Sequence, residues 1–189
     1  MIVTVLSDKT VTKYYRFYGE RHSILQLGYL IDFEIKESNN FLPQLRGISH
    51  NGFQWLYNRE KLLKWHKLIT TIEPHFRDVN EISSFYYNIL LNAAKKWSKQ
   101  SAKRLSIEVL IKILKFEGRL QPLNKCVICN QLIEDNISLI DGFLPTHSSC
   151  SSLEAINKNA LIKLFNNSTT ILLDDNIIDR VYLIALKSF

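Results

Sequence analysis

The chain has 189 residues, of which 46% are hydrophobic and 22% are charged, and its formal net charge is +6. This composition excludes a chain that is disordered throughout, and the lack of any run of about 18 apolar residues excludes a membrane-spanning helix. Thirteen Lys or Arg stand against six Asp or Glu in residues 51–120, and such a basic segment indicates either a polyanion partner or a solvated helical surface.

Residues 1 to about 52 predict β-strands. An extended apolar run over residues 2–6 is followed by residues 11–18, which are rich in β-branched and aromatic side chains. Apolar and polar residues then alternate over 25–35, which predicts a strand with one buried face. Residues 42–48 predict a further strand, at an edge because of Pro43. Several short strands in about fifty residues predict a small, strongly curved barrel.

Near Gly52 the apolar spacing changes from that of strands to that of helices. Strands followed by helices predict an α+β protein, with a barrel domain over 1–52 and a helical domain over 53–189. The predicted helices are 53–72, closed by Pro74; one from Asn80 to about 97; one capped by Ser101 and ended by Gly118; one from Ser151 or Ser152 to about 165; and 177–186, preceded by Asp174 and Asp175.

Two pairs of potential metal ligands lie in the second half of the chain. Cys126 and Cys129 form one pair, and His147 and Cys150 form the other. Two residues separate the members of each pair, a gap that lets a tight turn direct both side chains at one ion. The chain has no other cysteine. The pattern therefore predicts a closed, tetrahedral zinc site, and the alternative is that buried cysteines and a surface histidine meet by accident. An odd number of cysteines also favours a reducing, cytosolic setting.

Three segments give the chain its resemblance to the RecO family, bacterial recombination mediators that assist DNA repair. They are residues 2–6 with 15–23, residues 113–123, and the cysteine–histidine pairs with Gly142-Phe143 between them. The chain looks like the short, epsilon-type members with a zinc site. The resemblance implies an OB-type barrel followed by a helical domain with a structural zinc. It also implies that the barrel lacks part of its first strand, because the family usually has a strand segment before Ile2-Val3.

The function implied by the resemblance is that of a non-enzymatic, cytoplasmic protein of DNA repair and recombination. Such proteins bind single- and double-stranded DNA, anneal complementary strands and help RecA replace single-strand-binding protein, with RecR as a further partner. The residues themselves leave two alternatives open, a zinc-stabilised interaction adaptor and a zinc-dependent enzyme acting on nucleic acid. The sequence has no Walker-type loop and no His-x-Glu tripeptide of a deaminase.

Two basic stretches are the predicted DNA-binding sites. In the first, Lys13 and Arg16 interleave with tyrosines, a pattern typical of single-strand binding. By resemblance, the following Arg21 and His22 fall where the family has a basic pair that helps to hold DNA. In the second, Lys95, Lys96 and Lys99 surround a tryptophan, although exposed lysines more often serve solubility. Arg104 is the predicted contact for the acidic tail of single-strand-binding protein, the alternative being an ordinary surface arginine.

Overall fold

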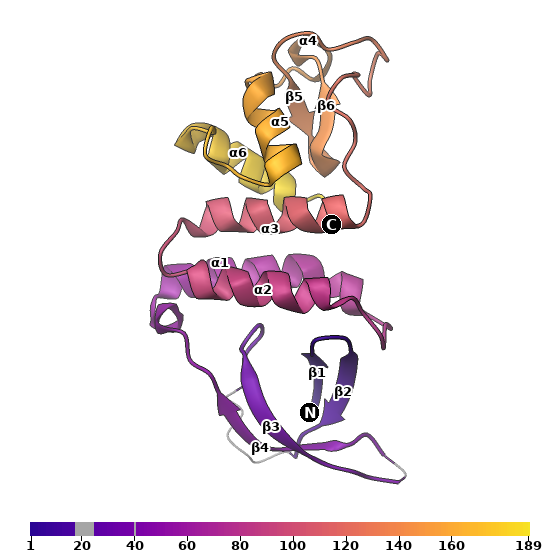
Figure 1. Cartoon of the computed structure of the whole chain (residues 1–189), viewed down its shortest axis with the longest axis vertical. Helices are drawn as coiled ribbons and strands as arrows, with labels where there is room; N and C mark the ends of the chain where they lie inside the picture. Colours follow the sequence, from indigo (N-terminus) through magenta and orange to yellow (C-terminus); the bar gives the residue numbers. More distant parts are fainter. Residues whose placement is uncertain (18–24, 40) are drawn as a thin grey trace. The chain divides into compact units, whose positions relative to one another are not determined.

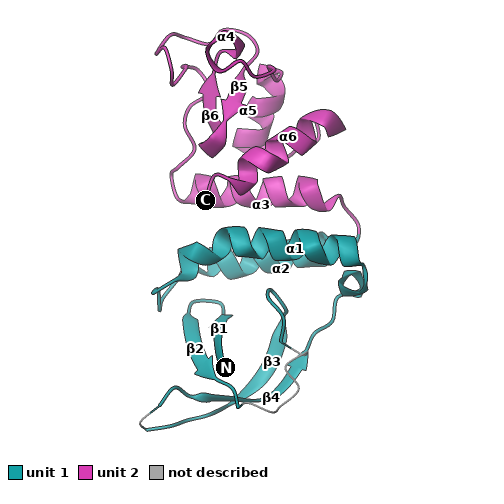
Figure 2. Ribbon diagram, turned by 180° about the vertical axis from the view of Figure 1, so that it is seen from behind, with its two compact units in different colours: residues 1–98 teal, residues 99–189 magenta. Residues whose placement is uncertain are grey.

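A computed structural model describes residues 1–17, 25–39 and 41–189 of the chain, whose elements are shown in Figure 1. The chain forms two compact units, Met1–Ser98 and Lys99–Phe189, which are coloured separately in Figure 2. Unit 1 therefore contains two helices in addition to the strands, whereas the sequence predicted a division between residues 52 and 53. Whether residues 1–52 form a domain of their own stays a prediction.

The described part of unit 1 contains a four-stranded mixed sheet. Its strands are β1 (Ile2–Leu6), β2 (Val11–Tyr15), β3 (Ile31–Lys36) and β4 (Gln44–His50), in the order β1-β2-β4-β3. The pairs β1/β2 and β3/β4 are antiparallel, and β2 meets β4 in parallel at the single residue pair Tyr15 and Gln44. Strands followed by helices confirm the predicted α+β class.

The segment before β3 differs from the prediction, because residues 25–30 form a turn rather than the start of a strand. Gly28 has a φ of +76°, and its carbonyl accepts a hydrogen bond from Nε1 of Trp65 at 3.0 Å. A Cβ at this position would lie 2.6 Å from the same nitrogen. The chain therefore turns where its backbone presses against α1 (Arg59–Ile72), and alternating hydropathy does not reveal such an approach.

The described part of unit 1 also contains the helices α1 and α2 (Ser84–Lys96), with the 3₁₀ segments η2 (Gln54–Tyr57) and η3 (Glu73–Phe76) on either side of α1. The single helix predicted over 53–72 is divided because Asn58 caps α1, its side chain accepting from the backbone N–H of Lys61 at 3.0 Å. Similarly, α2 is capped by Ser83 and not by Asn80. The Asn80 carbonyl instead accepts from the N–H of Val11 at 2.9 Å, which ties residue 80 to the start of β2.

All three tryptophans of the chain lie together in the core of unit 1. Trp65 packs against Trp55 and Trp97 with ring centroids 5.2 and 5.0 Å away, and none of the three is more than 4% exposed. Each indole N–H donates to a backbone carbonyl: Trp55 to that of Ala94, Trp65 to that of Gly28, and Trp97 to that of Lys61. This cluster fixes α1, α2 and the turn before β3 against one another.

Unit 2 is built on α3 (Ala102–Phe116), which contacts α5 (Lys158–Asn167) and α6 (Asp175–Leu186). Between α3 and α5 lie the short elements β5 (Ser138–Ile140), η4 (Asp141–Phe143), β6 (Leu144–Thr146) and α4 (Ser148–Ser151). The helix predicted from Ser151 or Ser152 to about 165 is wrong at its start. Ser152 is left-handed and ends α4, and α5 begins only after Asn157, whose side chain accepts from the N–H groups of residues 159 and 160.

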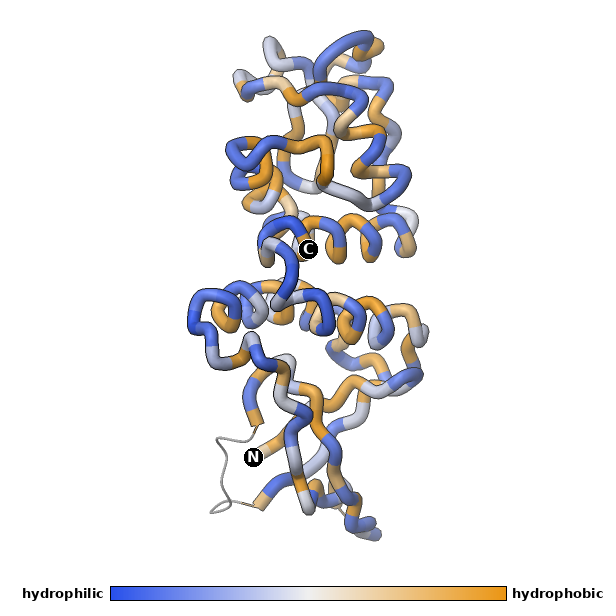
Figure 3. Tube along the Cα trace, turned by 60° about the vertical axis from the view of Figure 1, so that its left-hand side comes forward, coloured by the Kyte–Doolittle hydropathy of each residue, from blue (hydrophilic) through white to orange (hydrophobic). Residues whose placement is uncertain are grey.

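Hydrophobic and hydrophilic residues interleave along the helices of both units, as the colouring of Figure 3 shows. Within residues 1–17, 25–39 and 41–189, no helix is both long and apolar enough to cross a membrane.

Candidate functional site

The predicted metal ligands come together in unit 2. The ligand atoms of Cys126, Cys129, His147 and Cys150 all lie within 4.8 Å of one another. Nδ1 of His147 is 3.4 Å from Sγ of Cys129 and 3.8 Å from Sγ of Cys150. Zinc bonds of about 2.0–2.3 Å in a tetrahedron place ligand atoms roughly 3.3–3.8 Å apart. The two distances from Nδ1 match this spacing, and the cluster could bind a metal.

The first ligand pair lies on a hydrogen-bonded turn. The N–H of Cys126 donates to the carbonyl of Gln131, and the N–H of Asn130 donates back to the carbonyl of Cys126, both at 2.9 Å. Asn130 has a φ of +61°, a left-handed conformation that asparagine tolerates better than most residues. The N–H of Val127 donates to the carbonyl of Pro145 in β6 at 3.0 Å, which brings this turn to the strand that leads into the second pair.

The second ligand pair is held by the start of α4. His147 precedes the helix, and its carbonyl accepts from the N–H of Cys150 at 3.1 Å. Nε2 of the imidazole lies 3.0 Å from the carbonyl oxygen of Leu132. When Nε2 carries the proton and donates to this oxygen, the lone pair of Nδ1 faces the sulfur atoms. A backbone acceptor behind a histidine is the usual way in which proteins orient a metal-bound imidazole.

The electrostatics of the cluster differ from one thiol to another. Burial raises the pKa of Cys126, but backbone N–H groups of Cys129, His147 and Ile128 hydrogen-bond to its sulfur and bring its pKa down to about 6. Burial, together with hydrogen bonds to the other two thiols, raises the pKa of Cys150. The site thus favours one thiolate and opposes a second. A bound divalent cation would supply the positive charge that lets the Cys150 thiol ionise as well.

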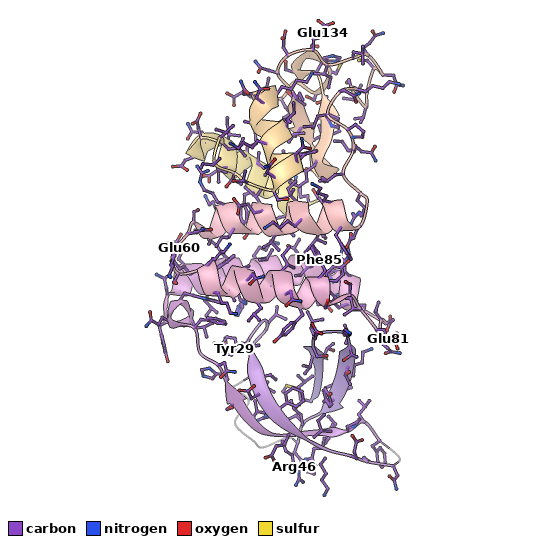
Figure 4. The ribbon with its side chains drawn as sticks, viewed as in Figure 1. Tyr29, Arg46, Glu60, Glu81, Phe85 and Glu134 are labelled. Carbon is purple, nitrogen blue, oxygen red and sulfur yellow. The ribbon has the colours of Figure 1, made fainter. Side chains whose placement is uncertain are left out.

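Four protein ligands fill a tetrahedron and leave no position for a water molecule or a substrate. Glu134, labelled in Figure 4, is exposed in the loop between the two pairs. A metal held by all four residues would therefore have a closed coordination shell.

The residues of the first basic stretch lie in different environments. The Lys13 side chain is exposed and forms an ion pair with Asp78 at 3.4 Å. Arg16 is only 3% exposed, and its backbone N–H and carbonyl bond to Met1. The side chain of Arg16 is therefore inside unit 1, and its contact with DNA stays a prediction. Arg21 and His22 lie outside the described residues.

Sequence reasoning missed an exposed face of the sheet that the structure brings together. Residues 13, 15 and 17 are exposed, whereas residues 14 and 16 are buried. Gln44 is opposite both Tyr15 and Lys36, so these three residues form a row across β2, β4 and β3. Arg46 follows on β4 and lies at the end of unit 1 away from α1 and α2 (Figure 4). Leu45 of β4 is buried, and neighbouring residues of a strand point to opposite sides, so Gln44 and Arg46 lie on the exposed face. The apolar Leu45 between two polar residues is the signal that would have indicated this face.

The second basic stretch spans the boundary between the units. Lys95 and Lys96 are exposed in the last turn of α2, and Lys99 is the exposed first residue of unit 2. Within the part of the chain that the structure describes, none of the three forms an ion pair. The intervening Trp97 is fully buried and is therefore a core residue and not a surface for base stacking.

Arg104, the predicted partner contact, is bound within unit 2. Its guanidinium donates to the carbonyls of Thr170 and Leu173 at 2.7 and 2.8 Å and to the carboxylate of Asp175 at 2.8 Å. These bonds hold the loop between α5 and α6 against α3. A contact of Arg104 with an acidic tail stays a prediction.

The comparisons with known proteins concern the N-terminal region. Residues 1–56 match a family model described as RecO N terminal. No curated protein matches the chain. The match supports a RecO-family protein and confirms the resemblance that residues 2–6 and 15–23 indicated, whereas the resemblance of the later segments stays a prediction.

Proposed function

We propose that this chain is a DNA-repair protein of the RecO type, which binds single- and double-stranded DNA and anneals complementary strands. The observation that carries the proposal is the match of residues 1–56 to the RecO N-terminal family. Within the same proposal the protein acts without enzymatic turnover and helps to load RecA onto strands coated with single-strand-binding protein. RecR and the tail of single-strand-binding protein are its proposed protein partners, and the cytoplasm is its proposed location.

The exposed lysines support a contact with the DNA backbone. Lys95 and Lys96 are exposed in the last turn of α2, Lys99 is exposed three residues later, and none of the three forms an ion pair with the described residues. An exposed lysine that replaces a condensed counterion on DNA gains free energy from the release of that ion. Such contacts carry no base specificity, which suits a protein that anneals strands of any sequence.

We further propose that the cluster of Cys126, Cys129, His147 and Cys150 binds zinc with a structural role. Thiolate and imidazole ligands select zinc over the hard cations magnesium and calcium. When bound, the ion would join residues 126–129 to residues 147–150, two parts of a segment whose own strands and helix have only three or four residues each. The free energy of metal binding would thereby stabilise the fold of this segment.

Annealing of two complementary oligonucleotides, followed by fluorescence energy transfer between end labels, tests the proposed function. The purified protein should accelerate annealing in buffer without nucleotide, and neither strand should be shortened or chemically altered. A protein that leaves annealing unchanged and binds neither strand would support the adaptor alternative, and product formation with turnover would support an enzyme.

The lysines are tested by the salt dependence of DNA affinity. Replacing Lys95, Lys96 and Lys99 together by glutamine should reduce the slope of log affinity against log salt by roughly 0.7–0.9 for each lost phosphate contact. A matched control replaces three exposed lysines that are scattered over other helices, Lys67, Lys112 and Lys163. If the two triple variants had the same slope of log affinity against log salt, Lys95, Lys96 and Lys99 would not be part of the DNA contact.

A further inference from the structure

Unit 1 contains an open cavity of about 940 Å³ beside its tryptophan cluster. The residues that line it lie between Met1 and Ala94, and most belong to β1, to residues 25–33, and to α1, η3 and α2. Protein interiors are normally packed without voids much larger than a water molecule, whereas sites for small molecules have volumes of about 300–1,000 Å³. The cavity therefore has the size of a ligand site.

The cavity lies against an edge strand of the sheet. Among the described strands, β1 pairs only with β2, so its other side has no neighbour. Val3 and Val5 of β1 are half-buried, whereas the residues at positions 2 and 4 are exposed. Val3 is opposite the buried Tyr14, and opposed residues share a face, so Val3 and Val5 face the inside of unit 1. The edge strand thus offers apolar side chains to the cavity.

One end of the cavity is apolar. It is lined by Phe53, Trp65 and Ala94, which come together around Trp55. The ring centroid of Trp55 is 5.7 Å from that of Phe53 and 5.2 Å from that of Trp65. The polar groups at this end are already paired, because Trp65 donates to the carbonyl of Gly28 and the carbonyl of Ala94 accepts from Trp55. A hydrocarbon chain would therefore meet apolar surface there without displacing a hydrogen bond.

The other end of the cavity is ionic. Three carboxylates and two cations line it, namely Asp8, Glu73, Asp78, Lys13 and Arg77. Both cations have partners, since Arg77 donates to the carboxylate of Glu73 at 2.7 Å and Lys13 pairs with Asp78 at 3.4 Å. Asp8 forms no ion pair with the described residues. The ionic end therefore has one carboxylate in excess and no unpaired cation among these lining residues.

The two ends are separated along α1. Trp65 at the apolar end and Glu73 at the ionic end are eight residues apart, which is about 12 Å at the rise of a helix. Ile69, halfway between them, also lines the cavity. The space is therefore elongated, and it changes from apolar to ionic along its length.

We propose that this cavity binds a single-chain amphiphile, with the alkyl chain along α1 and a cationic head group at Asp8. The chain is favoured by the apolar walls and by the length of the cavity. A cationic head is favoured over an anionic one because the ionic end already pairs its own cations and has one carboxylate in excess. This inference goes beyond the proposed function and does not depend on DNA binding.

The test follows the binding of N-phenyl-1-naphthylamine, an uncharged fluorescent probe of apolar sites, to the full chain at neutral pH. One probe should bind per chain. Excitation of tryptophan should produce probe emission and quench the protein emission, because Trp65 lines the cavity. A chain that does not bind the probe, or that binds it without quenching, would overturn the proposal.

Alkyl compounds then compete with the probe, at concentrations below those at which they form micelles. 1-Octanol should displace the probe about 15-fold more tightly than 1-hexanol, since each added methylene gains about fourfold in affinity. Octylammonium should bind about threefold more tightly than 1-octanol and about tenfold more tightly than octanoate. Octanoate that binds as tightly as octylammonium would show that the head group is not selected by the excess carboxylate.

Two filling variants locate the site. Val5→Trp and Leu91→Trp enlarge half-buried lining side chains on β1 and α2, and each should weaken probe binding about tenfold. Leu63→Trp is the matched control, because Leu63 is 58% exposed on α1 and does not line the cavity. The probe is excited directly here, so that the added indole does not change the signal, and the urea midpoint of each variant reports its fold. Filling variants that bind the probe as Leu63→Trp does would exclude the cavity as the site.

A charge variant tests the ionic end. Asp8→Asn should remove the advantage of octylammonium over 1-octanol and leave the affinity for 1-octanol unchanged. Glu37→Gln is its control, because Glu37 is an exposed carboxylate of unit 1 that does not line the cavity. An advantage of octylammonium that survives in Asp8→Asn would contradict the placement of the head group. Annealing of DNA by the unaltered chain, measured in parallel, succeeds or fails independently of all these outcomes.

Discussion

The two units use different means to hold their chains together. Unit 1 contains all three tryptophans and no cysteine, and its helices meet through a buried aromatic cluster. Unit 2 contains all three cysteines and no tryptophan, and its segment between α3 and α5 brings Cys126, Cys129, His147 and Cys150 into a cluster that could bind a metal. Apolar packing distributes stability over many contacts, whereas a metal site concentrates it in four bonds. The two units should therefore respond to different perturbations, and tryptophan fluorescence should report on unit 1 alone.

The largest effect is expected from the metal cluster. Cys126→Ser, or removal of the ion by a strong chelator, should unfold residues 121–157, because structural zinc sites contribute about 10–16 kcal/mol of apparent binding free energy. We expect lower ellipticity, faster proteolysis between residues 121 and 157, and one zinc per chain lost in metal analysis. Tryptophan emission should not change. A simultaneous red shift of the emission would show that unit 1 depends on the metal and would break the comparison.

A smaller effect is expected from the aromatic cluster. Trp65→Ala removes a ring that is 3% exposed and that contacts both other tryptophans. Truncation of a buried tryptophan costs about 3–5 kcal/mol, so the urea midpoint of the remaining tryptophan signal should fall. The zinc content should stay at that of the unaltered chain, since the ligands are in unit 2. Loss of zinc in this variant would contradict the independence of the units.

Two glycines with similar backbone conformations sharpen the comparison further. Gly28 of unit 1 has a φ of +76° and is packed against Trp65, whereas Gly118 of unit 2 has a φ of +69° and a Cβ there would meet nothing within 4 Å. Gly118→Ala should cost about 1–2 kcal/mol, the strain of a left-handed alanine alone. Gly28→Ala should cost about 1–3 kcal/mol more, because the added carbon displaces the indole. Equal losses in thermal unfolding would mean that the turn at Gly28 relaxes without strain.

The smallest effect is a pH dependence confined to unit 1. Burial lowers the pKa of His66 below its ordinary value of 6.5, and Nε2 has no hydrogen-bond partner among the described residues. The unfolded chain therefore takes up the proton at higher pH than the folded chain does. Stability is fully present above pH 6.5 and falls as the pH drops below it. Urea titrations of tryptophan emission at pH 7.5 and pH 5.5 should show this loss, and His66→Gln should reduce it.

The sequence was most informative where chemistry depends on spacing. The two-residue gaps between Cys126 and Cys129 and between His147 and Cys150 predicted the metal cluster without any knowledge of the fold. The change from strands to helices likewise predicted the α+β class. Element boundaries were less predictable, because Asn58 and Asn157 compete with several other polar residues that could cap the same helices.

Surface residues were harder to predict than ligands. Side chains alternate in direction along a strand, so about half of those in residues 13–17 must point inward, but the sequence pattern alone does not say which half. Which side chains point inward depends on contacts between residues that are far apart in the sequence. The ring of Tyr14, for example, packs against the ring of Phe33 in β3, with the two centroids 5.4 Å apart. Arg16 follows Tyr14 into the interior for the same reason, and Arg46 was missed because its exposure depends on the pairing of β4.

The narrow junction between the two hairpins of the sheet has a consequence for hydrogen exchange. Within the described strands, β1/β2 and β3/β4 are joined only at Tyr15 and Gln44, with the amide of Tyr15 bonded to the carbonyl of Pro43 at 2.9 Å. This amide should exchange faster than those inside either hairpin, because breaking one ladder position separates them. Amide protection at Tyr15 is therefore a local measure of how firmly the two hairpins are joined.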